Sequence, residues 1–287
     1  MIRIADITDV AGCRAVVALQ EAVWGRDGEI VPASLLVVSA KRGGILLGAY
    51  EGDDLAGFVW SMPGWRDGLA THWSHMLAVR PAARGAGLGE RLKLAQRERA
   101  LQAGVEVIEW TFDPLQAPNA HLNLHVLGCT AAEYRADAYG PMAGPLTAGT
   151  PTDRLVAEWR LREAHVARRL GARRARGLVA RDRGVLEAPP AIDVRRDGDW
   201  LVCGDVHVHD ARRVLLPVPA RFTEMQQQAT PAALAWRLAA RQAFEAYFSR
   251  GYRAVDFFLD RESGAGRYLL ALAADPPSQP SRNAGLH

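Results

Sequence analysis

The sequence predicts an α/β (α+β) fold in which a mixed central sheet is flanked by helices. Short apolar segments with strand-like alternation are interspersed with longer segments whose apolar residues recur at helical spacing. Glycines stand at the junctions, as at Gly104, which ends a helical segment directly before an alternating one. A helix–glycine–strand segment of this kind recurs near the C-terminus, so the same architecture is expected in the second half.

The N-terminal part is expected to begin with a strand and a helix and to continue with a hairpin. Apolar runs on both sides of Gly52-Asp53-Asp54 have the pattern of a β-hairpin. Pro81 ends the following strand, and Asn119 is expected to cap a short helix that closes at Gly128. The expected strands span residues 2–4, 45–50, 55–62, 71–79 and 105–112, and the expected helices span 9–23, 88–103 and 119–127.

A further helix is expected to begin at Thr152, because that threonine can serve as its N-cap. Its apolar stripe would consist of Leu155, Val156, Trp159 and Val166. Arginines are frequent between residues 168 and 183. We interpret them as a solvated helix end and linker rather than a nucleic-acid site, since no interleaved aromatic residues offer stacking platforms.

The C-terminal region contains a second copy of one segment. Residues 86–113 match residues 233–260 without a gap, and Gly104 falls on Gly251. We interpret this region as a degenerate half-copy of the N-terminal fold that lost its phosphate loop, and the alternative is chance similarity between two amphipathic helices. The expected elements are a hairpin over 192–195 and 200–208, a strand at 214–218 and a helix at 230–250, followed by a strand that buries Val255, Phe257 and Leu259.

Length and composition bound the organisation of the chain. The 287 residues, 49% hydrophobic and 23% charged, are typical of a globular protein with one large or two smaller domains. We expect a catalytic domain at 1–160, an arginine-rich helix end and linker at 161–190, an α/β half-repeat at 191–275 and a disordered tail at 276–287. Three dispersed cysteines and the lack of a long apolar run indicate a cytoplasmic protein without disulfides or a membrane partner.

Residues 84–89 carry the main functional signal, because they place three glycines at a strand-to-helix junction. Glycines let the backbone turn tightly around a ligand, and the free N–H groups of the first helical turn attract a pyrophosphate. Arg84 adds a full positive charge. A dinucleotide-binding fold also has glycines here but in the order G-x-G-x-x-G, whereas this sequence reads R-x-x-G-x-G.

The stretch LAVRPAARGAGLGERL resembles the acyl-CoA-binding motif of the GNAT superfamily of acyl-CoA-dependent N-acyltransferases. The resemblance covers about 60 residues, 71–128, and implies the GNAT fold with a C-terminal degenerate half-GNAT unit. It implies acetyl-CoA or another acyl-CoA as co-substrate and no metal. By resemblance, the backbone of Leu77, Ala78 and Val79 binds the pantetheine arm, Asn119 lies near it, and the pyrophosphate is held by Arg84, Gly85, Ala86, Gly87, Leu88 and Gly89.

Catalysis of acyl transfer requires a base for the ammonium of the acceptor and an acid for the departing thiolate. His75 is the candidate base, expected on one strand face with Leu77 and Val79, although a partly buried structural histidine is the alternative. The family commonly has a tyrosine as the acid, and Leu124 stands at that position here. His125 is the favoured replacement; Tyr134 and Tyr139 are further candidates, and the thiolate could also leave without an acid.

Other polar residues carry weaker signals. His121 and His125 share a helix face and His207 and His209 a strand face, but neither pair has a third ligand that would complete a metal site. Arg135 and Arg154 are candidates for binding a substrate carboxylate, with structural ion pairs as the alternative.

The function expected from the sequence is transfer of an acetyl or succinyl group from acyl-CoA to a small-molecule amine, such as an amino acid. The alternative is a non-catalytic acyl-CoA-binding sensor, which would bind CoA without releasing thiol. A nucleic-acid partner is not expected, since the net charge is only +3, and a homodimer is compatible with the sequence.

Overall fold

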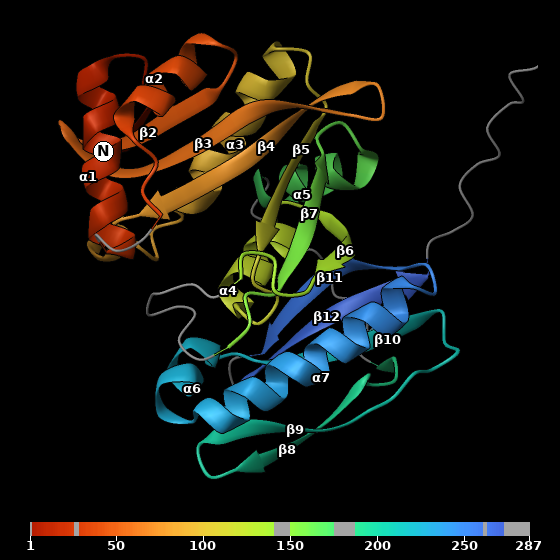
Figure 1. The fold of residues 1–287 in the computed structure, drawn as a ribbon. Helices are drawn as coiled ribbons and strands as arrows, with labels where there is room; N and C mark the ends of the chain where they lie inside the picture. The colour runs from red at the N-terminus through yellow and green to blue at the C-terminus, as the bar shows by residue number, and fades with distance from the viewer. Residues whose placement is uncertain (1, 26–28, 141–149, 175–186, 261–262, 273–287) are drawn as a thin grey trace, which may run out of the picture.

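The computed structural model describes residues 2–25, 29–140, 150–174, 187–260 and 263–272. A ten-stranded sheet extends through them, as Figure 1 shows in outline. The strand order is β1-β2-β3-β4-β5-β7-β6-β11-β12-β10, and β8 and β9 form a separate two-stranded sheet. Every paired neighbour in the large sheet is antiparallel except β4 and β5, which are parallel. The predicted α/β fold with a mixed central sheet is therefore confirmed.

The N-terminal half follows the predicted order with small shifts of the boundaries. Its strands are β1 (Ile2–Asp6), β2 (Ile45–Glu51), β3 (Asp54–Arg66), β4 (Leu69–Val79), β5 (Val107–Phe112), β6 (Thr130–Arg135) and β7 (Arg154–Arg160). Its helices are α1 (Val10–Trp24), α2 (Ala33–Lys41), the short 3-10 turn η1 (Pro81–Ala83), α3 (Leu88–Gln102), α4 (Ala117–Ala120), the π-helical turn η2 (His121–Val126) and α5 (Ala164–Arg174). The sequence analysis did not predict α2 or η1.

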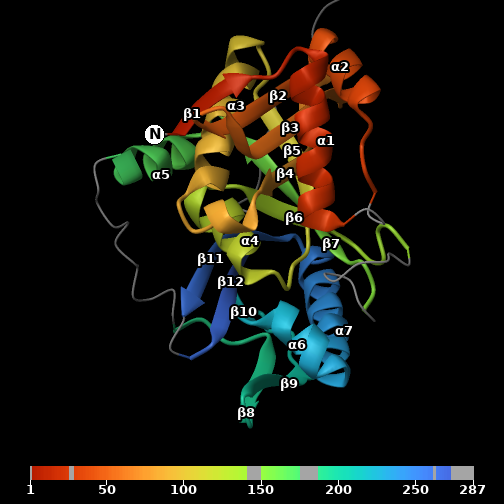
Figure 2. The same cartoon turned by 90° about the vertical axis from the view of Figure 1, so that its left-hand side faces the viewer.

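Helices cover both faces of the N-terminal strands (Figure 2). One face packs against α1 and α2 through a cluster that includes Cys13, Leu36 and Trp60. The opposite face packs against α3, whose Leu92 and Ala100 belong to a second and larger cluster. Apolar residues at helical spacing thus bury one stripe of each helix, as the sequence pattern predicted.

Two local predictions are wrong in this half. The segment after Thr152 is strand β7 rather than a helix, because it lies between β5 and β6 and pairs its backbone with both. Sequence-local helical spacing cannot reveal this tertiary pairing. The helix predicted from Asn119 begins at Ala117 instead, with Gln116 at the N-cap and Pro118 in the first turn, so Asn119 does not cap it.

The C-terminal region adds strands to the same sheet and places a long helix across them. Its elements are β8 (Ile192–Asp197), β9 (Trp200–Val206), β10 (Arg213–Pro219), α6 (Phe222–Gln228), α7 (Thr230–Phe248), β11 (Tyr252–Asp260) and β12 (Ala265–Leu272). Helix α7 lies between the β8–β9 hairpin and the large sheet (Figure 1). The predicted hairpin, strand and long helix are present, whereas α6 and β12 were not predicted.

The half-copy differs from the first copy in strand order. In the first copy β4 and β5 are direct neighbours, but β12 lies between β10 and β11 in the second. A bulge between Ala254 and Asp256 also changes the faces of β11, so Phe257 is buried while Val255 and Leu259 are only half-buried. The helix–glycine–strand segment therefore recurs, but the sheet order of the first copy does not.

Buried ion pairs attach the C-terminal region to the N-terminal half. The Arg237 guanidinium donates to both carboxylate oxygens of Asp113, each at 2.7 Å. Arg241 contacts Asp153 in the same bidentate way. One hydrophobic cluster extends from β2 to α7. The division into four parts stays a prediction, and the tail and part of the linker lie outside the described residues. No helix in the described part of the chain could cross a membrane.

Candidate active site

The parallel strands β4 and β5 separate along their length and leave an open strand edge. Their register pairs His72 with Ile108 and Trp73 with Glu109 and extends no further. On its other side, β4 stays paired with β3 as far as Val79. Alternate backbone groups of the β4 residues after Trp73 therefore face the gap between the two strands. An extended ligand could form hydrogen bonds with these backbone groups, as an added strand would.

The glycine-rich turn lies at the end of this open edge and leads into α3. Gly85 and Gly87 have φ angles of +82° and +73°, in the left-handed region that favours glycine. A Cβ added at either position would meet no atom within 4 Å, so the space around the turn is open. The first N–H groups of α3 have no intrahelical acceptor, and the helix dipole makes this end positive. Arg84 is fixed beside the turn because its Nε donates to the carbonyl of Val79 at 3.2 Å.

The remaining predicted cofactor contact, Asn119, lies on the helix that follows β5. Asn119 is exposed on α4. A Cβ at Gly89 would lie 3.7 Å from Leu122 and 3.8 Å from Leu77, so the helix after β5 approaches both α3 and the open edge. The open edge of β4 and the start of α3 therefore meet η2 at one place, through Leu77, Gly89 and Leu122.

His75 occupies a β-bulge on β4, since the β3–β4 register passes from Met76 directly to Ser74. The bulge turns the His75 side chain to the other face of the strand. The prediction that His75 shares a face with Leu77 is therefore wrong. Its ring instead packs edge-on to Trp60 at 5.3 Å, on the side of α1 and α2. Partial desolvation lowers the pKa of His75 below its usual 6.5, and the opposing effect of Glu29 is smaller. The lowered pKa favours the neutral imidazole.

This same face carries three charged side chains that the sequence analysis did not single out, Arg66, Glu109 and Glu158. Glu109 and Glu158 lie opposite each other on β5 and β7, and Arg66 bonds to both carboxylates. Burial raises the pKa of Glu109 despite Arg66, whereas hydrogen bonds from Arg66 and Arg160 outweigh burial and lower the pKa of Glu158. Glu109 pairs with Trp73, and Arg135 lies 5.9 Å from the centre of that indole ring. A glutamate inside an apolar strand was the available signal for this cluster.

The predicted acid His125 lies in different surroundings. Its Nδ1 is 3.0 Å from Asp256 on β11, and Arg169 bonds to the same carboxylate and to the carbonyl of His125. The ring of His121 stacks on it at 4.9 Å. These contacts join η2 to β11 and α5, whereas His75 contacts β3. The two predicted catalytic histidines therefore do not share neighbours.

The remaining acid candidates are also engaged. Leu124 is fully buried in the core. Tyr134 donates to Asp153 at 2.6 Å, and burial followed by that contact raises its pKa far above 10. Tyr139 is exposed, and its hydroxyl lies 2.7 Å from that of Thr111 on β5.

Arg135 and Arg154, the candidates for a substrate carboxylate, both have local partners. The Arg135 guanidinium bonds to Glu133 at 2.6 Å. Arg154 donates to the carbonyl of Asp153 and lies 5.3 Å from the ring of Tyr139. Asp153 itself pairs with Arg241 rather than with its neighbour in sequence.

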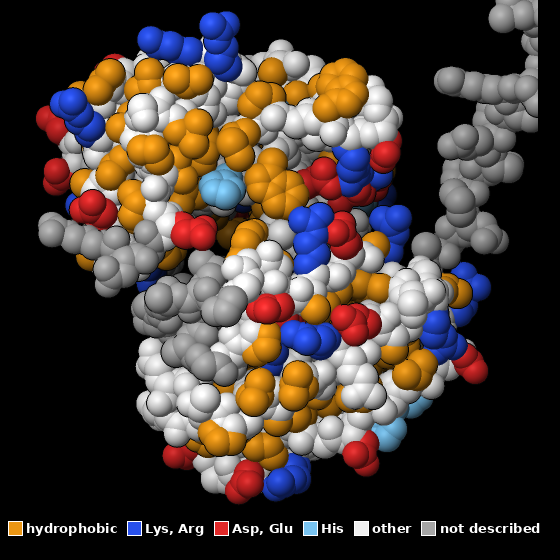
Figure 3. Space-filling model, in the orientation of Figure 1, with side chains coloured by type: hydrophobic (Ala, Val, Ile, Leu, Met, Phe, Trp, Pro, Cys, Tyr) orange, Lys and Arg blue, Asp and Glu red, His pale blue; other side chains and the backbone are white. Residues whose placement is uncertain are grey.

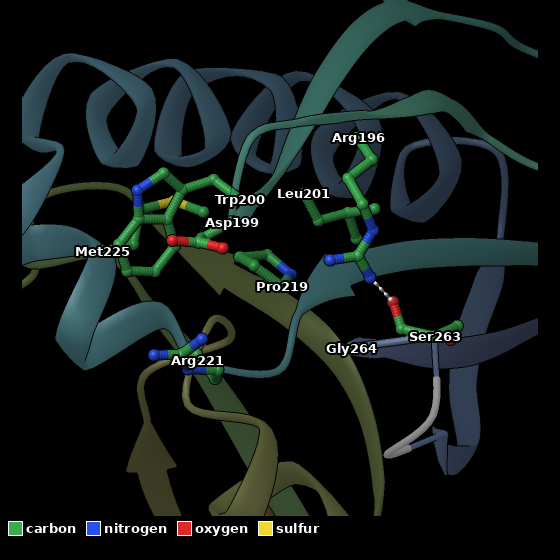
Figure 4. A pocket seen from close by; sticks show the side chains of 9 residues that line it. All are labelled: Arg196, Asp199, Trp200, Leu201, Pro219, Arg221, Met225, Ser263 and Gly264. Atoms are coloured by element: carbon green, nitrogen blue, oxygen red, sulfur yellow. Dashed lines mark hydrogen bonds between the residues drawn. The ribbon is translucent and has the colours of Figure 1, made fainter.

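A separate pocket in the C-terminal region contains none of the predicted site residues (Figure 4). One side is formed by Trp200 on the β8–β9 hairpin and by Arg221, whose guanidinium lies 5.3 Å from that ring. On the other side Arg196 donates to the carbonyl of Ser263 at 3.1 Å. In the space-filling view, the surface is also hollowed where the N-terminal strands meet the α7 half, and charges of both signs lie near this hollow (Figure 3).

Comparison with solved structures finds similar chains that correspond to just over half of this one. A protein of Salmonella typhimurium, solved with its cofactor acetyl-CoA, is 21% identical with a TM-score of 0.43, covering 57% of this chain and 95% of its own. The ribosomal-protein-S18-alanine N-acetyltransferase of Escherichia coli is 16% identical with a TM-score of 0.45. The match covers 57% of this chain and 96% of that protein. An aminoglycoside 6'-acetyltransferase of type Ii is 17% identical with a TM-score of 0.45. The match covers 56% of this chain and 98% of that protein.

A family model gives the decisive match, while no curated protein matches the chain. Residues 16–128 fit the acetyltransferase (GNAT) family. The matched range begins in α1 and includes the open edge of β4, the glycine-rich turn, α3, β5 and the helix after it. Over these residues the chain therefore matches the GNAT acetyltransferase family.

Proposed function

We propose that this protein transfers an acyl group from acyl-CoA to an amine. The observation that carries the proposal is the separation of β4 from β5 after Trp73, with the glycine-rich turn at the open end. An extended pantetheine arm suits the free backbone groups at Leu77, Ala78 and Val79, and the first turn of α3 suits the pyrophosphate. When bound, acyl-CoA supplies an activated acyl group next to this edge.

The acceptor amine is proposed to bind on the face of the sheet that carries Glu109. An ammonium ion is attracted by Glu109 and Glu158, and Trp73 provides an apolar wall beside them. Arg66 and Arg135 give the same region positive charge, which favours an acceptor that also has a carboxylate. We therefore propose an amino acid as the acceptor class.

Within this arrangement His75 would act as the base. A base must be unprotonated before it can accept a proton from the acceptor ammonium, and the lowered pKa favours this neutral form of His75. His125 is not carried into the proposal, because the Asp256 and Arg169 contacts fix it in a polar network with β11 and α5.

The experiment is a measurement of free thiol during incubation with acetyl-CoA or succinyl-CoA and a panel of amino acids, amines and peptides. We expect thiol release that depends on the acceptor, together with CoA binding in calorimetry. Binding of CoA without thiol release for any acceptor would instead support the sensor alternative. Loss of both in a variant of the glycine-rich turn would connect the activity to this site.

A further inference from the structure

A buried polar cluster lies at the point where β4 and β5 separate, on the face that packs against α3. The Lys93 ammonium on α3 donates to Ser74 Oγ at 2.8 Å and to Gln96 Oε1 at 3.3 Å. Gln96 Nε2 lies 3.1 Å from the same hydroxyl. All three side chains are buried, and Lys93 is only 2% exposed. A lysine is rarely buried to this degree without a carboxylate partner.

The register places this cluster at the branching point of the two strands. Trp73 and Glu109 are the last pair between β4 and β5. The next residues along the two strands are Ser74 and Trp110. Lys93 contacts both following residues, since its Nζ also lies 3.5 Å from the centre of the Trp110 ring. The ammonium therefore spans the two strands at the inner end of the gap.

Each element that packs against Lys93 contributes one of its neighbours. Ser74 comes from β4, Gln96 from α3 and Trp110 from β5, and Cys129, just before β6, is the titratable group close to it. Burial lowers the pKa of Lys93 to about 7, and burial raises the pKa of Cys129 beyond its usual range. Lys93 can thus both hold and release a proton near neutral pH, while Cys129 stays a thiol.

We propose that Ser74, supplied by Lys93, protonates the sulfur that leaves in the acyl transfer, an inference that rests on the proposed function. The acceptor nitrogen forms a bond to the acyl carbon, and the carbon–sulfur bond breaks with its electron pair going to sulfur. The Ser74 hydroxyl proton moves to sulfur and a Lys93 proton moves to Ser74 Oγ. The neutral Lys93 amine regains a proton from water after the products leave.

The geometry favours this direction of proton transfer. Ser74 Oγ accepts a hydrogen bond from Lys93 and lies 3.1 Å from Gln96 Nε2 and 3.2 Å from Gln96 Oε1, to which its own hydroxyl donates in the free protein. A proton that Ser74 gives to sulfur can therefore be replaced directly from Lys93. The pyrophosphate would be held at the start of α3, the same helix that carries Lys93. His75 contacts the opposite face, so base and acid stand on different sides of the sheet. Leu124, at the position of the family's tyrosine, cannot donate a proton. In this scheme Ser74 touches the reacting sulfur and Lys93 is a positioning residue.

The lysine content of the chain allows a direct test of Lys93. Lysine occurs only at positions 41 and 93, and Lys41 is exposed at the end of α2. Protein labelled with ¹³C at the lysine side chains therefore gives two lysine signals, which a Lys41→Arg variant assigns. We expect the Lys93 signal to titrate near pH 7 and to move to higher pH when CoA is bound, because the thiolate stabilises the ammonium.

Ionisation of bound CoA provides a readout that needs no known acceptor. The ultraviolet absorbance of the thiolate, followed against pH, should give an apparent thiol pKa about one unit or more lower in the native complex than in the Lys93→Met complex. Lys41→Met is the matched control and should behave as the native protein. In turnover, Lys93→Met and Ser74→Ala should each be slower by about a hundredfold, and Ser74→Thr should recover much of the rate since it keeps the hydroxyl.

The outcomes separate the two levels of the proposal. If CoA does not bind the native protein, the proposed function fails and this inference fails with it. If CoA binds but its thiol ionises identically in native protein and Lys93→Met, the acid assignment alone is overturned. A folded Lys93→Met variant with native turnover and pH profile would likewise reduce the cluster to a packing role.

Discussion

Substitution of Gly87 by aspartate tests the proposed acyl-CoA site most directly. Gly87 is the N-cap of α3 and has φ +73°, with no atom within 4 Å of an added Cβ. The new side chain therefore displaces no protein atom. It places a carboxylate where the pyrophosphate is proposed to bind, at the positive end of the helix.

The expected magnitude follows from the charge and the backbone. Two like charges about 4 Å apart repel by about 4 kcal/mol at an effective dielectric constant of about 20. Because about 1.4 kcal/mol corresponds to a tenfold change, CoA affinity should fall by about a thousandfold. The left-handed backbone costs a non-glycine residue about 1–2 kcal/mol. Aspartate adopts the left-handed conformation more readily than most other residues. Its negative charge at a helix N-terminus also stabilises the folded state by about 0.3–1 kcal/mol. The loss of folding stability should therefore be small.

Gly104 at the other end of α3 offers a matched control. It has φ +76° and is equally open, so Gly104→Asp carries the same charge and backbone cost. We expect Gly104→Asp to bind CoA with native affinity and to unfold at lower urea concentration than Gly87→Asp, because its charge opposes the helix dipole. Calorimetry and urea titration measure the two quantities. Native CoA affinity in Gly87→Asp would refute the placement of the pyrophosphate.

Three further predictions concern other buried or titrating groups. His75→Ala should lower turnover by about a hundredfold. In the native enzyme the acidic limb of the rate profile should lie below pH 6.5, since the neutral form is active and burial lowers the pKa; an unchanged profile in the variant would remove His75 as the base. Asp113→Ala should lower the free energy of unfolding by about 3–5 kcal/mol, because it leaves the Arg237 guanidinium, 1% exposed, without its partner. The double variant Asp113→Leu/Arg237→Met should recover much of this loss, and equal losses in both would argue against the explanation. The free energy of unfolding of the native protein should rise relative to that of Lys93→Met by up to about 1.4 kcal/mol per pH unit between about pH 7 and 10.5. The reason is that Lys93 is protonated in this range only in the unfolded chain. Parallel curves of stability against pH would contradict a lowered pKa for Lys93.

Local chemistry explains why much of the N-terminal half could be predicted. The hairpin at Gly52, the glycine-rich turn and the stop at Gly104 are set by residues adjacent in sequence, and the structure shows positive φ at all three places. The strand–turn–helix order then follows from apolar periodicity. The family match over residues 16–128 agrees with this part of the sequence reading.

Features that depend on distant residues could not be predicted in the same way. The bulge at His75 arises from its pairing with β3, and no local signal reveals which face the ring takes. His125 is set by Asp256, which lies 131 residues further along the chain. Lys93 reads as an ordinary polar residue on α3 until Ser74 and Trp110 are brought beside it. Amphipathic spacing likewise cannot distinguish a helix from strand β7, which only its two neighbours in the sheet define.

The C-terminal region is bound to the parts of the N-terminal half that shape the proposed site. Arg237 holds Asp113, the residue directly after β5, and Arg241 holds Asp153, directly before β7. Asp256 on β11 fixes η2, the turn that follows Asn119 and the helix α4. A bound acyl-CoA would need β5 to stay apart from β4 and α4 to stay beside α3. The added strands and α7 therefore hold in position the elements that border the proposed site. The connection between β10 and α7 has no glycine-rich turn of its own with which to bind a phosphate.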